Sequence, residues 1–341
     1  MDFDTVTDPI DFNGPTVTVR PFEAQKPKAT PPATGRIDRA ELRARLAKVM
    51  ARNLKTTLHC INTHKEWAVI GGGSSINDEV STIRRLKRQG VAIVSVNKSH
   101  DWLLEHGIVP WAHVLLDPKE WVADYVKRPR KDVRYFVASQ CHENVFDALE
   151  GFPVFLWHAG QDFPEDNVAE PDNYLREHCP PSKGHTWQIV PGGTTVGMRT
   201  PMLGHHMIDG VDVFHMFGMD SSRGPEGKMH GYDKPEPPDA ARGKQFLTHR
   251  GKRYWFDTNS HMARQFEDFD GFLKDLKGHF DAGRMRKSFK MKFYGSGLLP
   301  FYAAMLGLHA SPECNRDPAK VGGYVLENNP MADIGLEKLA I

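Results

Sequence analysis

The feature that most constrains the fold is the alternation of short apolar runs with helix-like stretches in the first half of the chain. The apolar runs span residues 67–70, 91–96, 113–116, 135–139 and 154–157. Such runs, without polar alternation, are typical of strands buried on both faces of a parallel sheet. Parallel neighbours must be joined by crossovers, which helices usually provide. The pattern therefore predicts an α/β fold, Rossmann-like and doubly wound, whose mostly parallel sheet carries helices on both faces.

The rest of the chain is expected to surround this sheet. We assign residues 1–36 to a flexible N-terminal arm, 37–65 to an N-terminal helix and linker, 66–235 to the Rossmann-like domain, and 236–341 to a C-terminal extension packed on it. The arm is rich in proline and has few large apolar side chains to offset the entropy of ordering. Residues 160–187 are expected to be an inserted loop or lid, and residues 221–243 form a second polar segment rich in proline and glycine. The extension should form a hairpin over 246–256, a helix over 259–276 and a strand over 290–294.

The N-terminal helix is expected to begin after Asp38 and to run to Leu54, with Asp38 as its cap. Leu42, Leu46 and Met50 repeat every four residues and so form one apolar stripe. We expect this stripe to dock on the main domain.

Composition excludes several classes of protein. The formal net charge is +1, with 44 Lys and Arg against 43 Asp and Glu, so bulk charge does not indicate a nucleic-acid binder. No apolar run reaches the roughly 18 residues that a membrane span needs. The 4 cysteines form no CxxC pair. We therefore expect a cytoplasmic protein without a disulfide framework, and the sequence leaves a homo-oligomer open.

Two glycine-rich turns follow predicted strands and precede predicted helices. The turns are Gly71, Gly72, Gly73, Ser74 and Ser75 in the first case, and Gly192, Gly193, Thr194 and Thr195 in the second. Glycines let the backbone approach an anion, and a helix N-terminus offers free N–H groups and a partial positive charge. Each turn by itself is equally typical of a tight turn. Together they predict that one nucleotide diphosphate or sugar nucleotide bridges them.

Polar residues also end the second and third strands. Asn97 could read a base or a ribose hydroxyl, and Asp117 could bind a ribose or a metal or act as a nucleophile. The alternative is that both residues cap the helices that follow them.

Catalytic candidates lie in a later polar loop. Asp220 closes another strand, and His230 and Tyr232 follow it, so a carboxylate, an imidazole and a phenol could orient an acceptor and move its proton. His261 is a second candidate for the base, although its neighbours could equally cap the next helix. The adjacent His205 and His206 are better explained as structural residues. Because no HExxH-like spacing occurs among the 17 histidines, the sequence predicts no metal site built from them.

Taken in order, the segments GGGSSIND, VSVNKSH, GIVPWAHVLLDP, GGTTVGM and FGMDSS with HGY resemble a known domain. It is the domain shared by motility-accessory-factor flagellin glycosyltransferases and 6-hydroxymethylpterin diphosphokinase MptE-like proteins. A fainter similarity connects the chain to bacterial sialyltransferases that use CMP-activated donors. That similarity implies donor contacts by Gly73, Ser75, Asn97, Thr194 and Thr195, with looser counterparts in Tyr232 and His230.

The resemblance implies a transferase that uses a nucleotide-activated donor, with an acceptor that the sequence does not name. A CMP-type sugar donor is favoured because its nucleoside monophosphate leaving group requires no metal cofactor. The alternative is a diphosphokinase that uses ATP and Mg²⁺, for which Asp117 follows the third strand without an adjacent acidic partner. A third hypothesis is a non-catalytic nucleotide-binding or assembly module.

Overall fold

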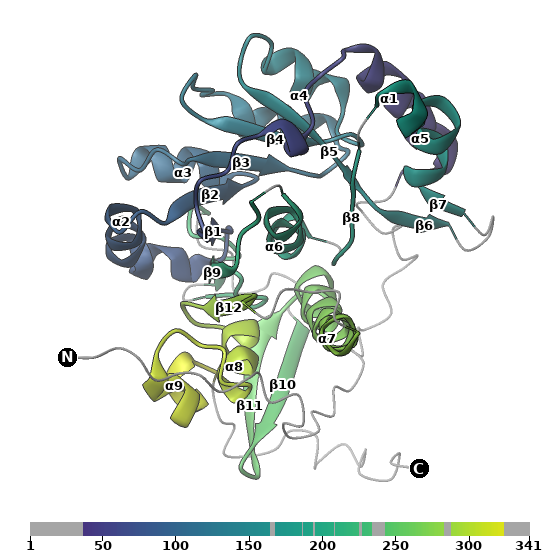
Figure 1. Ribbon diagram of the computed structural model, residues 1–341. Helices are drawn as coiled ribbons and strands as arrows, with labels where there is room; N and C mark the ends of the chain where they lie inside the picture. The colour runs from purple at the N-terminus through teal and green to yellow at the C-terminus, as the bar shows by residue number, and fades with distance from the viewer. Residues whose placement is uncertain are drawn as a thin grey trace.

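The computed structural model describes residues 37–163, 168–185, 187–193, 195–207, 209–224, 227–233, 243–282 and 288–323. The predicted arm over 1–36 and the candidate Thr194 lie outside these residues. The core of the fold is a parallel sheet in the order β12-β9-β1-β2-β3-β4-β5-β8 (Figure 1). Its strands are β1 (Glu66–Ile70), β2 (Ala92–Val96), β3 (Ala112–Leu115), β4 (Arg134–Ala138), β5 (Val154–Ala159), β8 (Ile189–Val190), β9 (Val213–Phe217) and β12 (Lys290–Phe293). The predicted Rossmann-like α/β fold is confirmed.

Helices cover both faces of the sheet because successive side chains of each strand point to opposite sides. They are α2 (Val80–Arg88), α3 (Ser99–Glu105), α4 (Glu143–Ala148) and α6 (Val196–His206), with 3-10 helices η1 (Thr57–His59), η2 (Ser74–Glu79) and η3 (Glu120–Val126). On β1, Ala68 and Ile70 join the apolar cluster of α2 and α3, whereas Trp67 joins that of α6. Gly204 lets α6 approach closely, since a Cβ there would lie 2.8 Å from the Trp67 ring.

The strand order reverses next to β1. From β1 the chain adds β2, β3, β4, β5 and β8 on one side, then returns to place β9 and β12 on the other side. The connections that leave the carboxyl ends of β1 and β9 therefore diverge. In open α/β sheets ligands bind in the crevice at such a reversal.

The N-terminal helix α1 (Arg39–Ala51) begins as predicted, because the Asp38 side chain accepts a hydrogen bond from the Glu41 amide. Leu42 and Leu46 of its apolar stripe are buried in a cluster with Phe163. Arg45 also donates to the carbonyl oxygens of Pro118 and Gln140 at the ends of β3 and β4. Helix α1 thus supports the edge of the sheet where Asp117 lies.

The prediction that 160–187 is an inserted loop was wrong. Its described residues form β6 (Gln161–Phe163), β7 (Val168–Glu170), α5 (Asp172–His178) and η4 (Pro181–Lys183). Strands β6 and β7 pair as an antiparallel hairpin. The buried Glu170 carboxylate accepts from Arg39 Nε of α1 at 3.1 Å and from the Tyr174 amide at 3.0 Å. Contacts with α1, which lies far away in the sequence, stabilise this segment.

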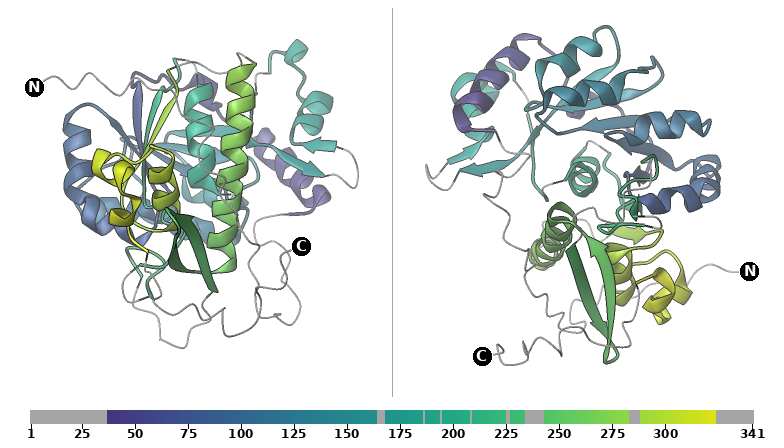
Figure 2. Two further views of the ribbon diagram at one scale, coloured as in Figure 1. Left: turned by 90° about the horizontal axis from the view of Figure 1, so that it is seen from below. Right: turned by 180° about the vertical axis from the view of Figure 1, so that it is seen from behind.

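The C-terminal part contains the predicted hairpin of β10 (Gly243–His249) and β11 (Lys252–Thr258), and the predicted helix α7 (Ser260–Asp281). Arg250 and Gly251, at the predicted turn, both have positive φ. It ends with α8 (Leu298–Met305), α9 (Pro312–Arg316) and η6 (Pro318–Val321). Strand β12 extends the main sheet beside β9, and α7 lies alongside α6 (Figure 2).

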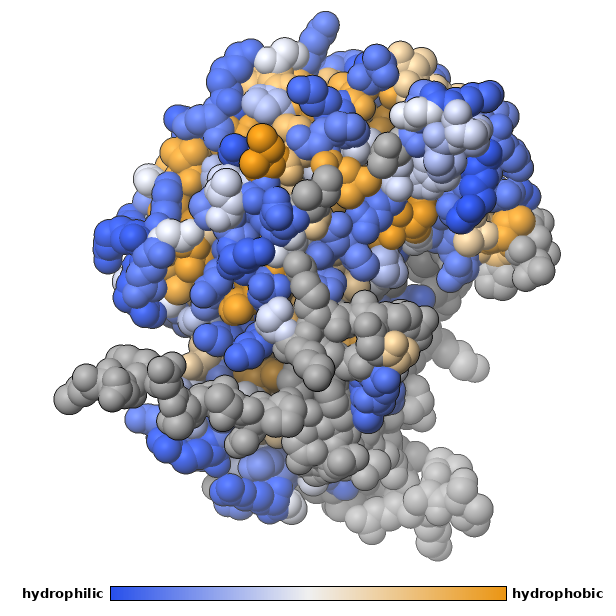
Figure 3. Space-filling view, viewed as in Figure 1, coloured by the Kyte–Doolittle hydropathy of each residue, from blue (hydrophilic) through white to orange (hydrophobic). Residues whose placement is uncertain are grey.

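The described surface has few large apolar side chains. On the face that Figure 3 displays, apolar residues are scattered between hydrophilic ones. Among the described residues, Ile61 and Trp121 are the large hydrophobic side chains that are exposed. No helix in the described part of the chain is long and apolar enough to cross a membrane.

Burial of the α1 stripe leads to a first prediction. Leu46 is fully buried, so Leu46→Ala should lower the free energy of unfolding by about 3 kcal/mol through lost burial and a residual cavity. The nearby Lys48 is exposed and pairs with Glu143 at the surface, so Lys48→Ala should cost less than about 1 kcal/mol. Urea denaturation of both variants measures this difference. Equal effects would show that α1 does not unfold together with the sheet.

Candidate functional site

The candidate site lies where β1 and β9 end side by side. The Gly71 amide donates to the Phe217 carbonyl and the Gly73 amide to the Gly218 carbonyl, each at 2.8 Å. A Cβ at Gly71 would lie 2.6 Å from the Gly218 carbonyl oxygen. Glycine is needed there because the two turns approach more closely than a side chain allows.

Asp220 lies in the turn after β9 and holds that turn against the first glycine-rich turn. Its carboxylate accepts from the Ser75 amide at 2.8 Å, the Ser75 hydroxyl at 2.6 Å and the Ser74 hydroxyl at 3.4 Å. Burial raises the pKa of Asp220 to about 6, although the serine hydrogen bonds oppose this shift. The serine donors that the sequence assigns to phosphate are thus bound by a carboxylate of the chain. Asp220 positions the first glycine-rich turn, and a direct catalytic role for it stays a prediction.

The loop over 227–233 covers this turn. The Gly231 amide donates to the Gly72 carbonyl at 3.0 Å, and Asn77 Nδ2 donates to the Gly231 carbonyl at 2.9 Å. A Cβ at Gly72 would lie 2.5 Å from the Tyr232 hydroxyl oxygen. The close packing of Gly72 therefore has a structural explanation, and phosphate binding there stays a prediction.

His230 pairs with a carboxylate that the sequence analysis did not consider. His230 Nδ1 lies 2.6 Å from Asp233 Oδ2, and the His230 amide also donates to that oxygen at 3.0 Å. The imidazole stacks on the Tyr232 ring, with centroids 5.1 Å apart and an angle of 7° between the planes. With Nδ1–H donated to Asp233, Nε2 is the ring nitrogen left to accept a proton. The spacing of His230 and Asp233 by three residues was the available sequence signal.

Strands β2 and β3 run parallel to β1, so they end at the same edge of the sheet. The Lys98 ammonium lies 4.9 Å from the centroid of the Tyr232 ring. Asn97 has a φ of 49°, and its buried Oδ1 has no hydrogen-bond partner among the described residues. Since α3 has no side-chain cap, the structure does not support the capping alternative for Asn97.

Asp117 makes the local bond that the capping alternative predicts. Its Oδ1 accepts from the Lys119 amide at 3.1 Å, and burial raises its pKa. Its charge acts on Tyr125 of η3, and so does that of Asp233. The sequence analysis did not consider Tyr125.

Met219 lies close both to the first glycine-rich turn and to the first turn of α6, which follows the second glycine-rich turn. A Cβ at Gly71 would lie 3.1 Å from Met219 Cε, and one at Gly197 in the first turn of α6 would lie 2.6 Å from the same atom. Thr195 caps α6, because its hydroxyl accepts from the Met198 amide at 3.4 Å. The binding of one ligand by both glycine-rich turns stays a prediction.

Arg199 of α6 binds backbone carbonyl groups in and next to the second glycine-rich turn. It donates to the carbonyl oxygens of Gly193, Val190 and Gly160 at 2.8, 3.1 and 3.0 Å. Burial lowers its pKa to about 10. Gly192 has a φ of 124°, in the region that favours glycine.

The C-terminal extension completes the site. Ser221 Oγ donates to Gln265 Oε1 at 3.0 Å, and Gln265 Nε2 donates to Thr195 Oγ1 at 3.3 Å. Gln265 of α7 thus connects the turn after β9 with the cap of α6. On the other side, the Leu299 amide donates to the Asp220 carbonyl at 3.1 Å. No local sequence pattern pointed to Gln265 or Leu299, because each residue contacts a turn that is distant in the chain.

Gly295 and Gly297 let this segment approach the site. A Cβ at Gly295 would lie 2.2 Å from Ser75 Oγ, and one at Gly297 would lie 2.7 Å from the Asp220 carbonyl oxygen. Both glycines also have positive φ, at 83° and 124°. Close approach and backbone conformation therefore both require glycine here.

The second candidate histidine, His261, and two buried histidines lie elsewhere. His261 is exposed in the first turn of α7, and Asn259 caps that helix by accepting from the Met262 amide at 2.9 Å. His113 and His158 are buried against Ser95 and Ser139, and burial lowers the pKa of His158 to about 4. Among the described residues, no three His, Cys, Asp or Glu side chains are grouped so that they could hold a metal ion.

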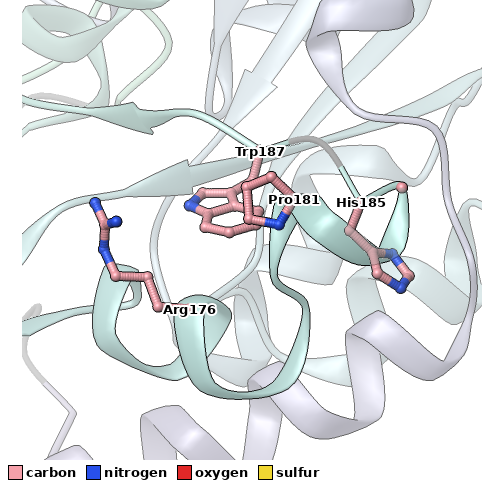
Figure 4. Close-up of a pocket in the computed structure, with 5 residues that line it drawn as sticks. Arg176, Pro181, His185 and Trp187 are labelled. Atoms are coloured by element: carbon pink, nitrogen blue, oxygen red, sulfur yellow. The ribbon is translucent and has the colours of Figure 1, made fainter.

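A separate cavity of about 370 Å³ lies beside α5 and η4. Figure 4 shows it with Trp187, Pro181, Arg176 and His185 around it. Arg176 Nε is held by Asp172 Oδ2 at 2.7 Å. The cavity contains none of the residues that the sequence nominated.

Comparison with known proteins identifies one family. The model described as 6-hydroxymethylpterin diphosphokinase MptE-like matches residues 42–224. The match includes both glycine-rich turns and Asp220 but ends before His230. No curated protein matches the chain.

The solved structures that are similar to this chain include that of the MAf glycosyltransferase from Magnetospirillum magneticum AMB-1. It has a TM-score of 0.48 and 15% sequence identity, over 76% of this chain. The chain spans 37% of the length of that protein. The similarity to CMP-dependent sialyltransferases stays a prediction.

The buried Asp220 leads to a pH-dependent prediction. Asp220→Ala leaves the Ser75 amide and hydroxyl without their acceptor, which should cost about 1–3 kcal/mol of stability. The folded-state pKa of about 6 lies above the ordinary value of 3.8. A raised carboxyl pKa contributes stability that is fully present below the unfolded-state value and is lost as the pH rises through the folded-state value.

The stability advantage of the wild type over Asp220→Ala should therefore shrink between about pH 4 and pH 7. Denaturation at several pH values measures this change, with the exposed Asp124→Ala as the control. A constant or growing difference over this range would show that the carboxyl is not held as the structure indicates.

Proposed function

The chain belongs to the 6-hydroxymethylpterin diphosphokinase MptE-like family, and from this premise we propose that it is a transferase with a nucleotide-activated donor. The donor would bind in the crevice at the ends of β1, β2, β3 and β9, and its transferred group would pass to an acceptor hydroxyl. One observation carries the proposal: the His230–Asp233 pair lies over the glycine-rich turn at the reversal of strand order.

The donor phosphate is assigned to the N-terminus of α6. This helix has 11 residues, so its dipole and first amides favour an anion near Gly193 and Thr195. Asn97 is assigned to the base or ribose, because its unpartnered buried oxygen needs a hydrogen-bond donor. Tyr232 and the Lys98 ammonium above it would border the same nucleotide.

His230 is assigned the role of general base. Asp233 orients the imidazole by accepting from Nδ1, so Nε2 can take the proton of an acceptor hydroxyl. With a sugar nucleotide, the acceptor oxygen bonds to the anomeric carbon as the bond from that carbon to the phosphate oxygen breaks. The nucleoside monophosphate leaves with the electron pair of the broken bond, and its charge is stabilised by α6.

We propose a CMP-type sugar nucleotide as the donor. Its leaving group carries a single phosphate, which a helix N-terminus can stabilise without a cation. The amide of Asn97, the phenol of Tyr232 and the hydroxyl of Thr195 suit a ribose and a pyrimidine. One glycine-rich turn is already engaged with Asp220, which leaves the second turn for that phosphate.

The family description favours a second candidate, a diphosphokinase that transfers a pyrophosphoryl group from ATP. Mg²⁺ is commonly bound by one or two carboxylates together with substrate phosphates. Asp117 fits such a role, because among the described residues its one hydrogen bond is that of the Lys119 amide to Oδ1. Mg²⁺ bound there would neutralise the charge on the phosphates. The third candidate, a non-catalytic binding module, predicts nucleotide binding without donor consumption.

A thermal-shift titration with CMP, UMP, GMP, AMP and ATP, with and without Mg²⁺, separates these candidates. We expect CMP to raise the melting temperature whether or not Mg²⁺ is present. Stabilisation by ATP only with Mg²⁺ would favour the diphosphokinase. If none of these nucleotides shifts the melting temperature, the nucleotide-dependent transferase is refuted.

Replacing the proposed base gives a kinetic prediction. His230→Ala should lower kcat by about 10²-fold to 10⁴-fold and change donor affinity little, because a base acts mainly in the transition state. The rate is the release of nucleoside monophosphate from the donor identified by titration. His261→Ala is the matched control, since that histidine is exposed on α7, and it should behave like the wild type. Similar losses in the two variants would remove His230 from catalysis.

A further inference from the structure

The cavity beside α5 and η4 takes no part in the proposed transferase site. Its volume of about 370 Å³ is within the range of small-molecule sites. Trp187 and Pro181 line it with apolar rings, and Arg176 and His185 line it with groups that can donate hydrogen bonds. In Figure 4 the two apolar rings lie in the middle, with Arg176 on one side and His185 on the other. Such a lining suits a ligand that has both a flat ring and a hydrogen-bond acceptor.

One carboxylate holds the two side chains that would contact this ligand most. Asp172 Oδ2 accepts from Arg176 Nε at 2.7 Å, and Asp172 Oδ1 accepts from Trp187 Nε1 at 3.5 Å. Because Arg176 gives its Nε to Asp172, the terminal nitrogens carry the remaining N–H donors of the guanidinium. The indole donates its single N–H to Asp172, so its ring faces can make apolar contacts. Both side chains are therefore ordered before any ligand binds.

The helix that carries Asp172 and Arg176 is fixed to the rest of the fold. The buried carboxylate of Glu170, just before α5, accepts from Arg39 of α1 and from the amide of Tyr174 within α5. The guanidinium of Arg43 in α1 also lies 5.4 Å from the centroid of the Tyr174 ring. One wall of the cavity thus rests on α1, which itself packs against the edge of the main sheet.

The charges around the cavity favour an anion. Among the described residues that line it there is no Asp or Glu, whereas Arg176 supplies a guanidinium. Asp172 offsets part of this charge, but its two oxygens are engaged by Arg176 and Trp187. A planar guanidinium binds a carboxylate or phosphate through paired hydrogen bonds. A flat ring packs well on the face of an indole.

We propose that this cavity binds a small aromatic anion. The ring of the ligand lies on Trp187 and Pro181, its carboxylate or phosphate is bound by the terminal nitrogens of Arg176, and His185 supplies a further donor. The lining contains none of the residues assigned to the transferase site. The proposal is therefore independent of the transferase function.

Probes that join a ring to a phosphate, and probes with only one of these parts, test the proposal. Phenyl phosphate and AMP have both parts, whereas phenol, adenosine and inorganic phosphate have one. Fluorine NMR of protein labelled with fluorotryptophan follows binding, and Trp187→Phe identifies the Trp187 resonance among those of the 7 tryptophans. We expect phenyl phosphate to shift this resonance and to bind at least about tenfold more tightly than phenol or inorganic phosphate, because ring and anion both contribute. Similar binding of AMP would extend the ligand class to nucleotides.

Variants of the lining separate the two contacts. Arg176→Ala should weaken phenyl phosphate binding about tenfold or more through loss of charge-assisted hydrogen bonds, and should leave phenol binding unchanged. Trp187→Ala should weaken it about threefold to tenfold in calorimetry. Lys183→Ala is the matched control, because it removes an exposed cation of η4 that does not line the cavity, and it should match the wild type. Arg176→Gln tests the same contact if Arg176→Ala does not fold.

Three results would each overturn the aromatic-anion site. The first is a Trp187 resonance that moves with neither phenyl phosphate nor AMP. The second is inorganic phosphate that binds as tightly as phenyl phosphate, which would show that the ring contributes nothing. The third is a folded Arg176 variant that binds phenyl phosphate as well as the wild type does.

Discussion

The site depends on the carboxylate of Asp220, which joins two turns that lie 145 residues apart in the sequence. Ser75 donates both its amide and its hydroxyl to this group, so the first turn of η2 is capped from the end of β9. A buried carboxylate is costly unless hydrogen bonds satisfy it. Here they come from the glycine-rich turn itself, which fixes the conformation of that turn before any ligand binds.

The other parts of the candidate site are arranged around this contact. Gly295 and Gly297 allow the segment before α8 to pack on Ser75 and Asp220, and Met219 separates the first turn from α6. Gln265 then connects Ser221 with the cap of α6. The C-terminal part therefore supports the proposed nucleotide-binding edge directly, through hydrogen bonds to the turn after β9 and to the cap of α6.

The turn proposed to bind the donor phosphate lies inside the region that the family model matches, and the proposed base lies outside it. The family model ends at residue 224, so it covers the two glycine-rich turns and Asp220. His230, Tyr232 and Asp233 come after it, in the loop that covers Gly72. A shared scaffold that holds a donor, with a separate loop that supplies the base, would allow relatives to differ in acceptor while keeping the same sheet.

The sequence alone determined the parallel sheet, its helices, the hairpin at Arg250-Gly251 and the position of the glycine-rich turns, because strand length, apolar runs and turn residues are local properties. The sequence also contained the three-residue spacing of His230 and Asp233, from which their pairing could have been predicted. Only the tertiary structure decided that Ser75 binds Asp220, that Gln265 joins two turns, and that 160–187 folds against α1. These contacts join residues far apart in the chain, and their geometry depends on strand order and close packing, which no local pattern specifies.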